Sequence, residues 1–162
     1  MDITGLAVSY LFVGLVLALT LLLQKKLSVN PFYTRKIVHI SVSNWWFILL
    51  AFFTRWETAV IGPVSFIILN YLSYRHHLVP SMELSDNRKN LGTVYFPISL
   101  LLLVILGFTE VIPLEAGGIG ILVLGYGDGS AALIGKRFGK RKRHLPGGEK
   151  SLAGTAAMVT VS

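Results

Sequence analysis

Apolar residues run along this chain in long blocks that short polar stretches separate. A helix needs about 20 mostly apolar residues to cross a bilayer. Blocks of roughly that length occupy residues 5–23, 37–53, 57–74, 94–112 and 116–135, and a further apolar block begins near Leu152. The pattern therefore predicts an all-α fold, a polytopic integral membrane helical bundle with five full spans and the start of a sixth.

The composition agrees with a membrane protein and favours a single unit. Hydrophobic residues make up 53% of the chain and charged residues only 14%, which is unlike a soluble domain. We expect one membrane-embedded catalytic domain over residues 1–162. The block from Leu152 to Ser162 is too short to cross a bilayer as a helix, so we expect either that a C-terminal continuation is missing or that this last helix lies in the membrane interface. The chain has no cysteine, which excludes a disulfide framework, a thiol nucleophile and a cysteine zinc site.

The charges are divided unevenly between the connections. The polar stretches 24–36, 75–93 and 136–150 hold 14 of the 15 Lys and Arg residues, whereas Arg55 alone lies between the alternate spans. The positive-inside rule then places these three loops in the cytoplasm and the N-terminus outside. Topology accounts for the net charge of +7, so we expect the lipid bilayer and not a nucleic acid as the macromolecular surroundings.

The stretch 125–154 contains the strongest candidate for chemistry. Asp128 lies between Gly127 and Gly129, at the end of an apolar block and before a dense run of cations. A carboxylate at the end of a span is costly unless something pairs with it. Asp128, Lys136 and Lys140 share a helix face, but Asp128 and Lys136 are separated by about 12 Å of helix rise. A metal-bound phosphate fits that gap better than a direct ion pair.

Two features of the same stretch have plain structural explanations as well. Small residues recur every fourth position at Gly127, Ala131, Gly135 and Gly139, a stripe that indicates close packing against another helix. The segment from Pro146 to Ser151 resembles no Walker A motif and reads as a turn into a helix that starts near Ser151. That helix start either attracts phosphate or is only a serine cap.

The second span carries ionisable groups at its cytoplasmic end. Arg35 and His39 share a helix face at i and i+4, and Lys36 neighbours His39 at i+3. An ionisable residue just inside the membrane is a candidate for function, but a single histidine can also be an interhelical hydrogen-bonding group. The pattern leaves both readings open, and the same holds for Asn44 and Asn70.

These elements together resemble the CTP-dependent lipid kinases, the family of phytol, dolichol and CTP-using diacylglycerol kinases, and look most like the phytol kinase branch. The elements that carry the resemblance are Arg35-Lys36-x-x-His39, the run Gly92–Pro97, and Gly127-Asp128-Gly129-Ser130-Ala131 with Gly135-Lys136-x-Phe138-Gly139 and Lys150-Ser151-x-x-Gly154-Thr155. The last element is also similar to the phosphatidate cytidylyltransferase signature. The resemblance covers residues 35 to about 158.

The resemblance implies transfer of the γ-phosphoryl group of CTP to the hydroxyl of a membrane lipid alcohol at the cytoplasmic interface, with Mg²⁺ on the phosphates. It implies catalytic roles for Asp128, His39, Arg35 and Lys36, with Asp128 as the metal ligand. It also implies a nucleotide-binding set of Gly127, Gly129, Ser130, Gly135, Lys136, Gly139, Lys140, Lys150, Ser151 and Gly154. Two alternatives stay open: a cytidylyltransferase that attacks the α-phosphate, and a small transporter of an anionic solute.

Overall fold

The computed structural model describes residues 1–76, 92–139, 142–145 and 148–162. The helices in this part of the chain are α1 (Asp2–Leu27), α2 (Pro31–Ser43), α3 (Trp45–Phe52), α4 (Trp56–Ala59), α5 (Ile61–His76), α6 (Gly92–Phe108), α7 (Leu114–Leu122), the π-helical segment η2 (Val123–Gly127), α8 (Asp128–Phe138) and α9 (Leu152–Val161). Two short strands, β1 (Lys142–Leu145) and β2 (Gly148–Ser151), precede α9. Across these described ranges the fold is all-α apart from this hairpin.

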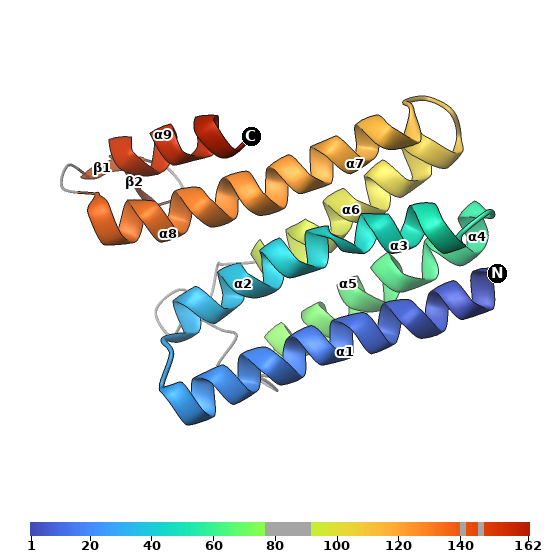
Figure 1. The fold of residues 1–162 in the computed structure, drawn as a ribbon, viewed down its shortest axis with the longest axis horizontal. Coiled ribbons are helices and arrows are strands. Elements are labelled where there is room, and N and C mark those ends of the chain that lie inside the picture. Colours follow the sequence, from blue (N-terminus) through green and yellow to red (C-terminus); the bar gives the residue numbers. More distant parts are fainter. Residues whose placement is uncertain (77–91, 140–141, 146–147) are drawn as a thin grey trace.

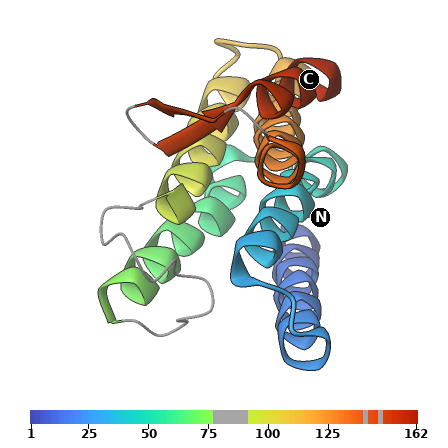
Figure 2. The same cartoon turned by 90° about the vertical axis from the view of Figure 1, so that its left-hand side faces the viewer.

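The helices form a bundle of two layers (Figures 1 and 2). In one layer α1, the α2–α3 rod and the α7–α8 rod lie side by side, and in the other α5 pairs with α6. Helix α9 folds back along the outer side of α8. Successive long segments run in opposite directions, so the C-terminal ends of α1, α5 and α8 and the N-terminal end of α2 all lie at the left-hand end of Figure 1.

Two of the predicted spans are found at full length in the described residues. Helix α1 and the continuous rod Leu114–Phe138 are long and apolar enough to cross a membrane. The predicted span 37–53 is divided at Asn44 into α2 and α3, and the span 57–74 is divided after Ala59 into α4 and α5. Helix α6 is shorter than predicted, since it ends at Phe108. A helix does begin at Leu152, as the sequence pattern predicts.

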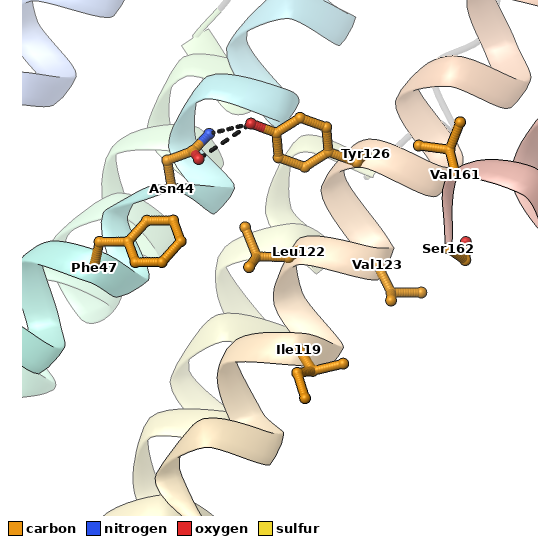
Figure 3. A pocket seen from close by; sticks show the side chains of 8 residues that line it. All are labelled: Asn44, Phe47, Ile119, Leu122, Val123, Tyr126, Val161 and Ser162. Carbon is orange, nitrogen blue, oxygen red and sulfur yellow. Dashed lines mark hydrogen bonds between the residues drawn. The ribbon is translucent and has the colours of Figure 1, made fainter.

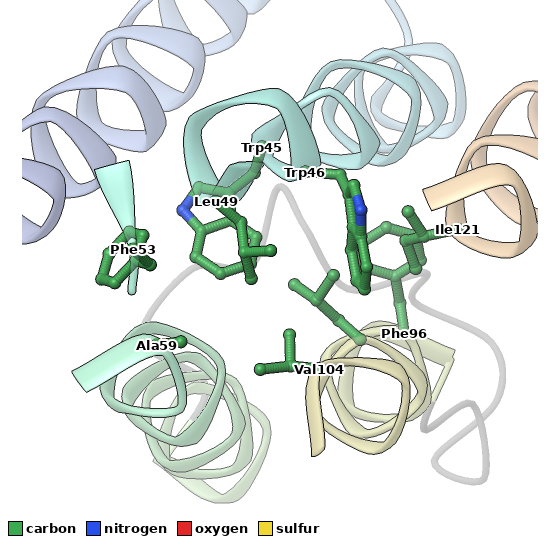
Figure 4. Packing of buried hydrophobic residues seen from close by; sticks show 9 residues of the cluster. Trp45, Trp46, Leu49, Phe53, Ala59, Phe96, Val104 and Ile121 are labelled. Carbon is green, nitrogen blue, oxygen red and sulfur yellow. The ribbon is translucent and has the colours of Figure 1, made fainter. Parts of the chain in front are cut away.

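The centre of the bundle is built on the tryptophans of α3. Trp45 and Trp46 are each 1% exposed, and they pack with buried side chains of α4, α6 and α7 (Figure 4). The indole Nε1 of Trp45 donates a hydrogen bond of 2.8 Å to the buried Oγ of Ser9 on α1. Glycines make room for the other indole, because a methyl group at Gly117 or Gly118 would lie 2.8 or 2.7 Å from the Trp46 ring. Close packing of this kind holds helices together where lipid replaces water.

The hairpin corrects the expectation of a simple turn before α9. Strands β1 and β2 pair antiparallel, with Arg143 opposite Lys150 and His144 opposite Glu149. Ser151 ends the hairpin and caps α9, since its Oγ accepts a hydrogen bond of 3.2 Å from the Gly154 N–H. The serine cap predicted from sequence is therefore confirmed, and the chain reaches it along a strand.

Candidate functional site

Helices α2 and α8 meet through one ion pair at the basic end of the bundle. The Nζ of Lys36 lies 2.6 Å from the Oδ2 of Asp128, across 92 residues of sequence. The side chains are 21% and 51% exposed, respectively. The pair thus sits in a partly open position, where water or a ligand can reach the carboxylate. It joins two residues that the sequence assigned separately to catalysis.

The approach of the two helices depends on glycine. A methyl group at Gly129 would strike the side chain of Ile40 at 2.5 Å, and one at Gly125 would strike Ser43. Both positions therefore admit α2 against the rod formed by η2 and α8. The π-helical turn Val123–Gly127 lies directly before Asp128, a feature that is common at functional sites. Sequence periodicity alone did not reveal this turn.

Lys136 makes the second contact between these helices. Its Nζ lies 4.0 Å from the centre of the Phe32 ring and 5.1 Å from that of Tyr33. Along the antiparallel pair of helices, Lys36 meets Asp128 and the first turn of α2 meets Lys136. Lys36, Asp128 and Lys136 therefore line one side of the same contact. Phe32 and Tyr33 are the residues that sequence reasoning missed, and an aromatic pair separated from Arg35-Lys36 only by Thr34 was the available signal.

His39 lies one turn deeper on α2 and faces the other layer. Its ring centre is 4.7 Å from that of Phe96 on α6, with the planes tilted by 37°. This contact joins the first sequence element to the run Gly92–Pro97. Arg35 is partly buried at the start of the same helix, and burial lowers the pKa of its guanidinium. The group stays cationic, because the ordinary pKa of arginine is far above neutrality.

The small residues predicted to bind nucleotide lie mainly between α8 and α9. A methyl group at Gly154 would come within 2.7 Å of the Ala131 carbonyl oxygen, and one at Gly139 would lie 2.6 Å from Ser151. The Oγ of Ser151 also donates to the Gly135 carbonyl oxygen at 3.4 Å. The predicted packing role of the stripe from Gly127 to Gly139 is therefore confirmed, and α9 is the partner. A nucleotide role for these residues stays a prediction.

The other predicted nucleotide residues are spread over the same end of the bundle. The Oγ of Ser130 donates to the Gly127 carbonyl oxygen at 3.1 Å, within the first turn of α8. Lys150 is exposed on β2. Lys140 lies outside the described residues. The structure thus places the Lys36–Asp128 ion pair and Lys136 along the same α2–α8 interface, and it leaves Lys150 on the neighbouring hairpin.

A separate open groove of about 380 Å³ lies on a different side of η2 (Figure 3). Its only hydrogen-bonded side-chain pair in the figure is Asn44 and Tyr126, whose hydroxyl is 3.0 Å from Nδ2 and 3.1 Å from Oδ1. The remaining walls are mostly apolar and come from Phe47, Ile119, Leu122, Val123 and Val161. Residues two apart on a helix do not face each other, so Tyr126 and the groove point away from Asp128.

The residues at the ion pair fit a magnesium–nucleotide complex better than a protein-only metal site. The described residues contain no group of three His, Cys, Asp or Glu side chains that could hold a metal. Mg²⁺ usually keeps several waters and binds through one or two carboxylates together with substrate phosphates. Asp128 is half exposed and has one oxygen, Oδ1, that the Lys36 contact leaves available. The single carboxylate is therefore suited to Mg²⁺ that arrives with a nucleotide.

Comparison with known proteins identifies a relative. The chain is 40% identical over 164 residues to a protein named phytol kinase from Synechocystis sp., and the alignment covers 98% of this chain. It spans 66% of the length of that relative, just under two thirds. No family model matches the chain, and no solved structure matches it. The chain is therefore a homologue of a phytol kinase over nearly its whole length.

Proposed function

We propose that this protein is a CTP-dependent kinase that phosphorylates the hydroxyl group of a membrane prenol, with phytol as the first substrate to test. The observation that carries the proposal is the 40% identity to a phytol kinase over 98% of the chain. The interface between α2 and α8 supports it, since a carboxylate and two lysines lie along it at the basic end of the bundle. Phosphoryl transfer depends mainly on such positioning and charge neutralisation.

The reaction assigns a task to each group at this contact. The prenol oxygen forms a bond to the γ-phosphorus of CTP, the bond to the β,γ-bridging oxygen breaks, CDP leaves, and the hydroxyl proton passes to a nearby base. Asp128 would hold the Mg²⁺ that neutralises the phosphates, and Lys36 and Lys136 would contact phosphate oxygens. Arg35 and His39 meet the transferring group or the incoming hydroxyl. Lys150 adds positive charge for the nucleotide, and Lys140, which lies outside the described residues, stays a predicted phosphate contact.

The membrane arrangement is part of the proposal. The α2–α3 rod and the α4–α5 segment each have about the length of a span when their interruptions are included, so five crossings remain compatible with the bundle. The basic end, which holds Lys25, Lys26, Arg75 and the α2–α8 contact, faces the cytoplasm, and the N-terminus lies outside. The reaction then takes place at the cytoplasmic interface within one membrane-embedded domain.

The assay uses purified protein in detergent or liposomes with Mg²⁺ and CTP labelled at the γ-phosphate. Phytol, longer prenols, diacylglycerol and phosphatidate are offered as acceptors, and ATP replaces CTP in a parallel series. We expect label in the prenol and little turnover with ATP. Label in pyrophosphate, with phosphatidate as acceptor, would instead identify a cytidylyltransferase. Absence of any label transfer under all these conditions would contradict the proposal.

A further inference from the structure

The ammonium group of Lys136 rests on two aromatic rings of the neighbouring helix. Its distances of 4.0 Å to Phe32 and 5.1 Å to Tyr33 both fall within the range of about 6 Å for cation–π attraction. The two rings lie 5.5 Å apart at an angle of 87°, an edge-to-face arrangement that is itself favourable. Lys136 therefore has a fixed partner although its side chain is exposed.

The local sequence holds these rings in place. Asn30 caps α2, and its side chain accepts a hydrogen bond of 2.9 Å from the N–H of Phe32 itself. Pro31 occupies the first helical turn, where its fixed φ suits the start of a helix. Phe32 and Tyr33 thus project from a well-defined helix start and not from a loose loop.

An exposed lysine side chain normally loses conformational entropy when it binds a ligand. The cost is about 2 kcal/mol of rotamer freedom for a long cationic side chain. A lysine that is already held on aromatic rings has lost much of this freedom before the phosphate arrives, and such preorganisation increases affinity. Phe32 lies one turn from Lys36, and Lys136 lies two turns from Asp128, so the held ammonium faces the same side of the helix contact as the ion pair.

We propose that Phe32 and Tyr33 are positioning residues that hold the Lys136 ammonium ready for the nucleotide phosphates at the α2–α8 contact. The proposal rests on the proposed function for the identity of the nucleotide. The aromatic rings act through Lys136 and do not touch the reacting atoms. Their effect falls on nucleotide binding and not on the chemical step.

The chain provides a matched control on the next residues of α8. The guanidinium carbon of Arg137 lies 5.5 Å from the ring centre of Phe138, its immediate neighbour in sequence. Phe138 is 62% exposed and belongs to α8 itself, so this cation–ring pair does not join α8 to α2. Replacing Phe138 removes the aromatic ring that contacts the Arg137 guanidinium, and it leaves the aromatic contacts of Lys136 in place.

The first experiment changes the ring electronics while it keeps the ring size. Phenylalanines with one, two and three fluorine atoms are incorporated at position 32, because fluorine withdraws the charge from the ring face that attracts a cation. We expect the KM for CTP to rise stepwise with fluorine number, while kcat and the KM for phytol stay constant.

Ordinary substitutions complete the series. Phe32→Leu should raise the KM for CTP by about 2- to 30-fold, the equivalent of 0.5–2 kcal/mol. Phe32→Tyr should keep the KM for CTP near that of the wild type, and Phe138→Leu should leave it unchanged.

The second experiment requires no enzyme activity. Reductive methylation of the folded protein, read by peptide mass spectrometry, reports how accessible the Lys136 ammonium is. We expect faster labelling of Lys136 in Phe32→Leu than in wild type, with Lys150 as the internal reference and Phe138→Leu as the control. The positioning role is overturned if Lys136 is labelled equally in all three proteins, or if the KM for CTP of an active enzyme does not change across the fluorine series. If Lys136 is labelled faster in Phe32→Leu but the protein does not turn over CTP, the contact between Lys136 and the ring is supported and only the proposed function is rejected.

Discussion

Lys36 and Asp128 hold each other at 2.6 Å although neither is deeply buried. Exposed ion pairs contribute only about 0–1 kcal/mol to stability, so the pair adds little to the fold. We expect Asp128→Asn to change the midpoint of thermal unfolding only slightly while it lowers turnover by at least about 100-fold, because the amide no longer attracts a hard cation. Unfolding in detergent and the γ-labelled CTP assay measure the two effects.

A charge exchange provides the control for this substitution. The double variant Lys36→Asp with Asp128→Lys retains an ion pair between α2 and α8 but moves the carboxylate to the other helix. A purely structural pair predicts that the double variant recovers the activity lost in each single variant. We expect it to fold and to remain inactive, since the carboxylate no longer lies on the first residue of α8.

Two substitutions at His39 can distinguish an aromatic packing role of this side chain from a hydrogen-bonding or catalytic role. Its ring lies against Phe96 at 4.7 Å, so His39→Phe keeps the aromatic contact and removes both ring nitrogens. We expect His39→Phe to fold normally and to lose about 100- to 10,000-fold in kcat, the usual range for a positioned acid or base. Full specific activity in the folded fraction of His39→Phe would assign the residue to packing. His39→Asn, which keeps a hydrogen-bonding group, tests the interhelical alternative.

Gly154 sets how closely α9 lies to α8. A methyl group there would lie 2.7 Å from the Ala131 carbonyl oxygen and 3.3 Å from the Gly135 Cα. Both are backbone atoms, which cannot avoid the clash by changing rotamer. We expect Gly154→Ala to cost about 1–3 kcal/mol of stability and to expose α9 to protease. Gly14→Ala is the matched control, since nothing lies within 4 Å of the added methyl group. Equal unfolding midpoints for the two variants would exclude a tight α8–α9 contact.

The orientation in the membrane can be tested with single cysteines, since the chain contains none. Ser28 is exposed after α1 at the basic end, and Val111 is 67% exposed in the α6–α7 connection. We expect a membrane-impermeant thiol reagent to label Val111→Cys in intact cells and Ser28→Cys only after the cells are opened. The reverse pattern would invert the proposed topology.

The helical segments could be predicted because lipid-facing helices need long apolar runs, and each predicted run contains helix in the structure. The interruptions were not predictable from hydropathy. Asn44 ends α2 by donating to the carbonyl oxygens of Ile40 and Ser41 at 2.9 and 3.4 Å, and Trp45 then begins a new helix. An apolar average over 37–53 conceals this local competition for backbone hydrogen bonds.

The sequence singled out Lys36, Asp128 and Lys136 as candidates but not the pairings that the structure gives them. Helical spacing placed Asp128 and Lys136 on one face and correctly separated them. It could not supply the partner of Asp128, because the choice of Lys36 depends on glycines that let α2 approach at Ile40. The aromatic partners of Lys136 likewise come from a helix about one hundred residues away. Contacts between segments distant in sequence depend on the tertiary structure, which the helical spacing of residues within one segment does not specify.

The gathering of cations at one end of the bundle has a kinetic consequence. A surface of one charge speeds the arrival of an oppositely charged molecule, and salt weakens this attraction over a screening length of about 8–10 Å. For a CTP-dependent enzyme, the nucleotide comes from water toward Lys36, Lys136 and Lys150. An uncharged prenol substrate, as proposed above, would arrive instead by lateral diffusion in the bilayer. Added salt should therefore slow the encounter with one substrate and leave the other untouched, and anionic headgroups should compete with CTP for the same surface.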